Sequence, residues 1–391
     1  MIPDLRKIFN SQFTETAYNN FLNDLNTSLR YPTDFRVSET PLFLSSELTK
    51  ELEAACDDLI LQIKSEHFLT NSLNAVPSHF KVSGDSDHPI FLQIDFAICK
   101  NETGGFIPQL IELQGFPSLY GYQAFFNDKI RKHFEIPENF QSYFSGHNLN
   151  SYQEILKQTI VGNENPENVI LLEIHPEEQK TRIDFAATER LTGIKTVCLT
   201  KVIKHGAKLY YKDNGKEIPI KRIYNRVIFD ELERKNLNFN FDFRDEMEIE
   251  WVGHPNWFFR ISKHSLPVLK GKYVPHCYYL NDLQSIPDDL HNYVLKPLFS
   301  FAGLGVDVEP TKEKLQGIKE KNNYILQQKI DYAPLIETPD EPSKVEIRMM
   351  FLWDKEPVLV NNLIRMSKGK MMGVDFNKNK TWVGSSIAFH P

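Results

Sequence analysis

A lysine followed by a glycine-containing loop is the strongest chemical feature of the sequence. Lys296 follows the β-forming residues 293–295, so we expect its ammonium group near a strand end, where it can reach a phosphate. Ser300, Gly303 and Gly305 come next, and glycines let backbone N–H groups approach phosphates closely. The stretch matches neither a Walker A loop nor a dinucleotide-binding loop. It predicts a triphosphate site, with a hairpin and a solvated lysine as the open alternative.

Two carboxylates and two amides lie on a predicted β-hairpin that begins near residue 90. Apolar residues alternate along its first strand, which places Gln93 and Asp95 together on the opposite face. Glu112 and Gln114 share one face of the second strand. A register that pairs Asp95 with Glu112 or Gln114 gathers oxygen ligands suited to Mg²⁺, whereas a shift by one residue separates them. The alternative is a polar face exposed to solvent.

A second predicted hairpin, residues 344–365, carries two arginines. Glu346 and Arg348 point to one face of its first strand, and Arg365 ends its second strand. Two guanidinium groups beside Lys296 suit the stabilisation of a transferring phosphoryl group. Taken singly, each arginine is more simply explained as a surface ion pair.

Two more segments belong to the candidate nucleotide site. Residues 257–269 place Lys263 near a predicted helix start. Residues 324–330 are apolar enough for a strand, and we expect its edge near Gln327 to recognise adenine through backbone hydrogen bonds.

The elements that must position these residues predict an α/β (α+β) chain with several parts. Residues 1–88 form an N-terminal helical segment, with helices expected at 3–28 and 45–68. Residues 89–160 contain the first hairpin and contribute to the cleft, and residues 256–391 form the nucleotide-binding region.

Residues 161–255 are expected to form a Rossmann-like domain. Val169–Ile174 is a continuous apolar run, and a helical pattern and a second strand at Lys195–Leu199 follow it. Its first strand-to-helix turn, residues 175–178, has no glycine fingerprint, which argues against a dinucleotide there. Further strands are expected at 208–211 and 222–228, with Asn214-Gly215 as a hairpin turn.

Composition excludes several functional classes. The chain of 391 residues has a net charge of −7 and 41% hydrophobic residues, which argues against general binding to nucleic acid or an anionic membrane. No apolar run is long enough to span a bilayer, and the first residues lack a secretory pattern. The four cysteines are scattered, as expected of free thiols in a reducing cytoplasm. We therefore predict a cytoplasmic protein, and the oligomeric state stays open.

In this order, the motifs resemble the synthetase domain of the glutathionylspermidine synthase family, which has a permuted ATP-grasp fold. The resemblance runs from residue 90 to the C-terminus. The corresponding residues are Gln93-Ile94-Asp95, Glu112-Leu113-Gln114 with 115–119, Ser262-Lys263, Leu295-Lys296-Pro297-Leu298 with 299–305, 324–327, and Ile364-Arg365. Separately, Glu346-Ile347-Arg348 resembles the acidic-x-Arg strand of other ATP-grasp ligases.

The resemblance implies an ATP-dependent ligase that joins a small carboxylate to an amine through an acyl phosphate, together with a Rossmann-like domain that precedes the ATP-grasp fold. It implies Mg²⁺ at Asp95, Glu112 and Gln114, and ATP phosphates at Lys263, Lys296 and the Ser300, Gly303 and Gly305 loop. Arg365 would contact the transferring phosphate, with Arg348 as a further catalytic candidate.

Two positions depart from the family pattern. Gln93 stands where the family has a catalytic arginine, and Gln114 stands where it has asparagine. Glutathione and spermidine are therefore not inherited as substrates. The alternative function is a nucleotide-binding relative without ligase activity, in a regulatory or scaffolding role.

Overall fold

The structure, a computed structural model, describes residues 2–299 and 305–391 as a mixed α/β fold with several sheets. Its α-helices are α1 (Pro3–Gln12), α2 (Glu15–Thr27), α3 (Ser46–Ile63), α4 (Glu66–Ser72), α5 (Tyr120–His133), α6 (Leu149–Val161), α7 (Arg182–Thr192), α8 (Phe229–Lys235), α9 (Trp257–Arg260) and α10 (Lys312–Gly317). Its strands are β1 (Leu42–Phe43), β2 (Phe91–Lys100), β3 (Phe106–Gln114), β4 (Val169–Glu173), β5 (Lys195–Cys198), β6 (Ile203–His205), β7 (Lys208–Asp213), β8 (Lys216–Ile220), β9 (Arg222–Asn225), β10 (Glu250–Val252), β11 (Cys277–Tyr279), β12 (Tyr293–Pro297), β13 (Tyr324–Gln328), β14 (Lys344–Trp353), β15 (Pro357–Ser367), β16 (Gly384–Ser386) and β17 (Ala388–Phe389).

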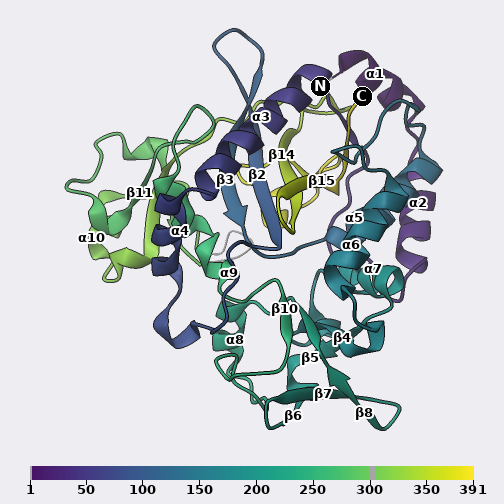
Figure 1. The fold of residues 1–391 in the computed structure, drawn as a ribbon. Coiled ribbons are helices and arrows are strands. Elements are labelled where there is room, and N and C mark those ends of the chain that lie inside the picture. Colours follow the sequence, from purple (N-terminus) through teal and green to yellow (C-terminus); the bar gives the residue numbers. More distant parts are fainter. Residues whose placement is uncertain (1, 300–304) are drawn as a thin grey trace.

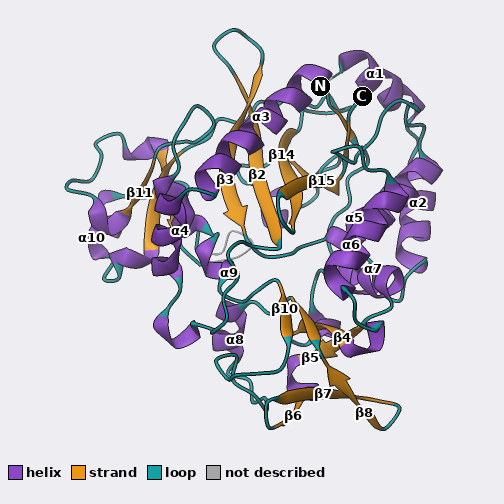
Figure 2. Ribbon diagram, in the orientation of Figure 1, coloured by secondary structure: helices purple, strands orange, loops and turns teal. Residues whose placement is uncertain are grey.

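A five-stranded antiparallel sheet joins the two predicted hairpins. Its strand order is β16-β15-β14-β2-β3, so β14 lies directly beside β2 although about 250 residues separate them. Figures 1 and 2 show these strands at the centre of the molecule. Both hairpins are present, and the sheet brings their polar residues to one place.

Helix α3 covers one face of this sheet. Its apolar residues recur at helical spacing, as the sequence predicts, and Ser45 Oγ caps it by accepting from the backbone N–H of Leu48 at 3.3 Å. Alternate residues of β2, including Leu92 and Ile94, pack in the same core as α3. The opposite face of β2 is also buried, so the alternative of a solvent-exposed polar face is wrong.

The Rossmann-like pattern corresponds to a four-stranded parallel sheet of order β10-β9-β4-β5, with α7 connecting β4 to β5. Asn214-Gly215 forms a hairpin turn, but it joins β7 to β8 in a separate three-stranded sheet. β9 leaves that hairpin and pairs in the parallel sheet.

The third part of the fold is a small antiparallel sheet of order β11-β13-β12. β13 is its central strand and pairs on both sides, with Leu326 opposite both Tyr278 and Leu295. The expectation that this strand has a free edge is therefore wrong, because the hydrogen-bonding groups along it face neighbouring strands. Recognition of adenine by this segment stays a prediction.

The N-terminal helices are shorter than predicted. The helix expected over 3–28 is divided, because Thr14 takes an extended conformation and caps α2. The helix expected over 45–68 ends at Ile63, and Ser65 caps α4. This region also reaches the other end of the chain, since β1 pairs in parallel with β17, and Figure 1 shows the two termini near each other.

Among the helices of the described residues, none has the length and apolar character needed to cross a membrane.

Replacing Gly115 with Ala should lower the free energy of unfolding by about 1–3 kcal/mol. Gly115 follows β3 immediately, and an added Cβ would lie 2.6 Å from the carbonyl oxygen of Trp257 and 3.0 Å from Cβ of Ile261. Urea unfolding followed by circular dichroism measures the change. Gly317→Ala is the matched control, because nothing lies within 4 Å of its added Cβ. Equal midpoints for the two variants would contradict the close packing of β3 on α9.

Candidate active site

The register of the central sheet places the predicted charged residues in adjacent rows. Asp95 on β2 lies opposite Glu112 on β3 and opposite Arg348 on β14. Glu346 lies opposite Arg365 on β15. Paired residues point to the same side of a sheet, so these five side chains share the face away from α3.

Asp95 is held by both arginines. Arg348 Nε and Nη2 donate to its two carboxylate oxygens at 2.6 and 2.7 Å, and Arg365 Nη2 donates to Oδ2 at 2.7 Å. Arg365 also donates to Oε1 of Glu346. The Asp95 side chain is only 1% exposed, whereas that of Arg365 is 37% exposed. Arg365 is therefore the accessible member of the group.

Two lysines approach the same row from other parts of the chain. Lys263 Nζ lies 3.6 Å from Glu112 Oε2. Lys296, at the end of β12 as predicted, donates to the carbonyl oxygen of Ile111 at 3.4 Å. A bulge between Asp95 and Phe96 leaves Ile111 outside the paired positions of β3, which makes that carbonyl available to the lysine. The two lysines and Asp95 thus lie in one site.

Electrostatics distinguishes the two glutamates. Burial raises the pKa of Glu112, but the positive charges of Lys263, Arg365, Lys296 and Arg348 outweigh burial and lower the pKa below its usual value. Burial raises the pKa of Glu346, and the charges of Asp95 and Glu112 add to that rise. Glu112 therefore stays ionised, whereas Glu346 holds its proton to a higher pH.

The pKa values of the cations follow from the same surroundings. Burial lowers the pKa of Lys296, and the charge of Glu112 offsets part of that effect. Burial also acts to lower the pKa of Arg365, but the neighbouring carboxylates Glu346, Asp95 and Glu112 raise it above its usual value.

The site has a surplus of positive charge. Three carboxylates of the cluster, Asp95, Glu112 and Glu346, lie among four cations, which are Lys263, Lys296, Arg348 and Arg365. With every group ionised, one positive charge is in excess. When Glu346 is protonated, the excess is two. An excess of positive charge with low exposure favours an anionic ligand.

A pocket adjoins the Glu112 end of the cluster. Gln114 belongs to its lining and donates to Glu112 Oε1 at 2.9 Å. The lining also contains aromatic side chains, so its polar atoms lie beside apolar surface. The remaining lining residues are Leu113, Phe116, Phe258, Ile261, Ser262, Lys263, Leu298 and Phe299.

Other predicted site residues have different surroundings. Gln93 is fully buried and donates to the carbonyl oxygen of Ser118 at 2.7 Å, while its Oε1 has no hydrogen-bond partner among the residues that the structure describes. Gln327 donates to the carbonyl oxygen of Leu110 at 3.3 Å, so its side chain links β13 to β3. Gly305 has φ +74°, and an added Cβ would lie 2.8 Å from Cγ of Pro297. Ser300 and Gly303 lie outside the described residues.

Sequence reasoning missed two neighbours of Arg365. Glu346 was placed on the correct face by strand alternation but was given no role. Tyr332 follows β13 in a loop; burial raises its pKa, and the charge of Glu346 raises it further. No local pattern marks this loop residue.

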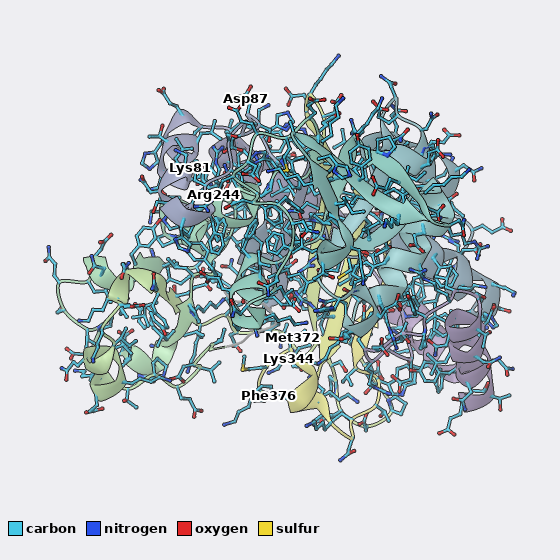
Figure 3. The ribbon with its side chains drawn as sticks, turned by 90° about the horizontal axis from the view of Figure 1, so that it is seen from below. Lys81, Asp87, Arg244, Lys344, Met372 and Phe376 are labelled. Atoms are coloured by element: carbon cyan, nitrogen blue, oxygen red, sulfur yellow. The ribbon has the colours of Figure 1, made fainter. Side chains whose placement is uncertain are left out.

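The end of the strand that carries Arg365 is fixed by a loop. Asn377 Oδ1 accepts hydrogen bonds from Ser367 Oγ and from the backbone N–H of Lys368. In Figure 3, Met372 and Phe376 of this loop are drawn near Lys344, whose backbone pairs with Ser367. The loop therefore begins where the paired part of the β14–β15 hairpin ends, two residues from Arg365.

Comparison with solved structures identifies the fold. A glutathione synthetase-like effector from Globodera pallida, in its apo form, aligns with a TM-score of 0.59 over 90% of this chain and 93% of its own chain, at 11% sequence identity. The fold is glutathione synthetase-like. The match does not single out glutathionylspermidine synthase, whose resemblance rests on the motifs. No protein-family model and no curated protein sequence matches the chain.

The predicted magnesium ligands fit the ion unequally. Both oxygens of Asp95 are bound by guanidinium groups, so Asp95 does not fit in this arrangement. Glu112 is 21% exposed and lines the pocket together with Gln114, which suits an ion held mainly by substrate phosphates. Within the described residues, no group of three His, Cys, Asp or Glu side chains can by itself hold a metal ion.

Glu346→Gln should make the free energy of unfolding less dependent on pH. Because the folded pKa of Glu346 lies above the usual 4.5, the folded state keeps a proton that the unfolded chain releases. This contribution is complete below the usual pKa and is lost as pH rises through the folded value, so wild type should lose stability relative to the variant between about pH 5 and pH 8.

Urea unfolding at several pH values measures that difference. Glu102→Gln, at an exposed position in the turn of the first hairpin, is the matched control. A stability difference between wild type and Glu346→Gln that stays constant over this range would contradict the raised pKa.

Proposed function

We propose that this protein is an ATP-dependent ligase that joins a small carboxylate to an amine. The observation that carries the proposal is the buried cluster of Asp95, Glu112, Glu346, Arg348 and Arg365, with Lys263 and Lys296 beside it, on a glutathione synthetase-like fold. Its surplus positive charge matches a reaction in which two of the three reactants, ATP and the carboxylate, are anions.

The proposed reaction has two steps. In the first, a carboxylate oxygen attacks the γ-phosphorus of ATP, an acyl phosphate forms and ADP leaves. In the second, the amine nitrogen attacks the acyl carbon, an amide bond forms, and the phosphate leaves while the nitrogen loses a proton. A carboxylate is a poor electrophile, and phosphorylation supplies it with a leaving group.

Positively charged side chains of the protein would stabilise the negative charge of the phosphates during these steps. Lys263 and Lys296 would hold ATP phosphates in the ground state and in the transition state, which lowers the dissociation constant for ATP. Arg365 is accessible and would contact the phosphoryl group in transit, where stabilisation of charge accelerates the chemical step. Glu112 and Gln114 would hold a Mg²⁺ ion, and this ion supplies neutralisation of phosphate charge when it is bound.

A second candidate function is nucleotide binding without ligase activity. It is favoured by Gln93, whose amide replaces the arginine expected from the family pattern and donates to the carbonyl oxygen of Ser118. In this case ATP would bind, and no pair of acid and amine would release phosphate. Both functions therefore predict that ATP binds, and only the ligase function predicts that phosphate is released.

Lys296→Met should weaken ATP binding by about 10- to 100-fold, because a hydrogen bond to a charged group contributes about 1.5–3 kcal/mol. Isothermal titration of ATP into the protein measures the dissociation constant without knowledge of the substrates. Lys319→Met is the matched control, since Lys319 is exposed and lies between α10 and β13, outside the charged cluster. Equal affinities of the two variants would remove Lys296 from the phosphate site.

Arg365→Lys should lower kcat by about 100-fold or more and change the ATP dissociation constant by less than about threefold. Lysine keeps the charge but loses the planar fork that reaches two acceptors. The assay is phosphate release from ATP with panels of small acids and amines, and a substrate pair found with wild type is then used for the variant. A wild type that binds ATP and releases no phosphate with any pair would favour the second candidate. Parallel losses in kcat and ATP affinity would mean that Arg365 contacts ATP in the ground state.

A further inference from the structure

We propose that Asp95 is a positioning residue that orients Arg348 and Arg365, and that the metal edge of the site consists of Glu112 and Gln114 alone. This inference rests on the ligase function proposed above. It divides the polar face of the sheet into a group with Asp95, Arg348 and Arg365 and a metal-binding group with Glu112 and Gln114. The sequence pattern placed Asp95 and Glu112 in one set of metal ligands.

The hydrogen bonds of Asp95 carry the first part of the argument. Its carboxylate accepts two bonds from Arg348 and one from Arg365, all between 2.6 and 2.7 Å. Charge-assisted bonds of this length and two-pronged geometry fix a guanidinium plane strongly. The two arginines come from neighbouring strands, and Asp95 is the acceptor that they share.

Accessibility carries the second part. A Mg²⁺ ion that works on ATP shares its coordination sphere with phosphate oxygens, so its protein ligands must be open to the nucleotide. The Asp95 side chain is 1% exposed and that of Arg348 is 6% exposed. Glu112 is 21% exposed and lies in the lining of the pocket. Only the second carboxylate meets the requirement.

Charge carries the third part. A divalent ion bound to Asp95 would lie within a few ångströms of two guanidinium groups that already neutralise this carboxylate, and like charges at such separation repel strongly where water is excluded. At Glu112, Oε1 accepts a hydrogen bond from the neutral amide of Gln114 at 2.9 Å, and Lys263 Nζ lies 3.6 Å from Oε2 on a long flexible side chain that can turn toward a phosphate.

The test compares Mn²⁺ affinity, by electron paramagnetic resonance with a non-hydrolysable ATP analogue present, in wild type, Asp95→Asn and Glu112→Gln. We expect Asp95→Asn to remain within about threefold of wild type, and Glu112→Gln to bind Mn²⁺ about 10-fold or more weakly. Equal weakening in the two variants would make Asp95 a metal ligand and overturn the inference.

Enzyme kinetics gives a second measurement, and a residue with a purely structural role would not give the same result. If Asp95 acts through Arg365, Asp95→Asn and Arg365→Lys should each lower kcat, and the double variant should be about as slow as the slower single variant. Fully additive losses would overturn the inference. The KM for ATP should change little in Asp95→Asn, because the lysines that hold the phosphates are retained.

A fold control keeps the test decisive. Should Asp95→Asn fail to fold because it leaves the guanidinium groups of Arg348 and Arg365 without their shared partner, the variant Asp95→Asn/Arg348→Gln removes the buried one of those two charges. Its Mn²⁺ affinity is then compared with that of Glu112→Gln. An affinity close to that of wild type supports the inference, and weakening equal to that of Glu112→Gln overturns it. Wild type that binds no nucleotide would refute the ligase proposal itself, and this inference with it, so the two failures are distinguishable.

Discussion

The buried contact between Asp95 and two arginines is the interaction on which the site depends. Removing the Asp95 carboxylate and the Arg348 guanidinium group from water costs several kcal/mol per ion, and good geometry repays that cost only in part. Apolar residues of similar volume would commonly stabilise such a core as well or better. The cluster is therefore poorly explained by stability. The function proposed here gives it a reason, because a catalytic site needs charges that are fixed in position before a ligand arrives.

The fold supplies that fixation by bringing distant segments into one sheet. Asp95 lies between Glu112 on one neighbouring strand and Arg348 on the other, so the order β14-β2-β3 sets the spacing of the charges. Helix α3 fills the opposite face with apolar contacts, which confines the charged side chains to the other face. A shift of β14 by one residue would turn Arg348 toward α3 and leave Asp95 unpaired. The sheet register and the charge cluster thus stabilise each other.

Local patterns predicted the hairpins and the charged faces but not their partners. Alternation placed Gln93 with Asp95 on one face of the first hairpin and Glu346 with Arg348 on one face of the second, and the structure agrees. Alternation does not tell which strands are neighbours in a sheet, so the contact between Asp95 and Arg348 could not be predicted. Asp95 was therefore interpreted as a metal ligand together with Glu112 and Gln114 of its own hairpin. The position of β13 in the middle of its sheet was missed for the same reason. The break at Thr14 was detectable in principle, because threonine is a common helix cap.

Two long hydrogen bonds join the small sheet to β3, and under the proposed function a nucleotide would compete with one of them. Lys296 and Gln327 extend from β12 and β13 to consecutive carbonyl oxygens of β3, at 3.4 and 3.3 Å, and bonds of this length are weak. Lys296 also has a lowered pKa because it is buried, so it loses hydration without gaining a strong partner. A phosphate oxygen is a better acceptor than the Ile111 carbonyl, since it is charged. Under the proposed function, exchange of that carbonyl for a phosphate would offset the desolvation of Lys296, and this gain would favour binding of ATP.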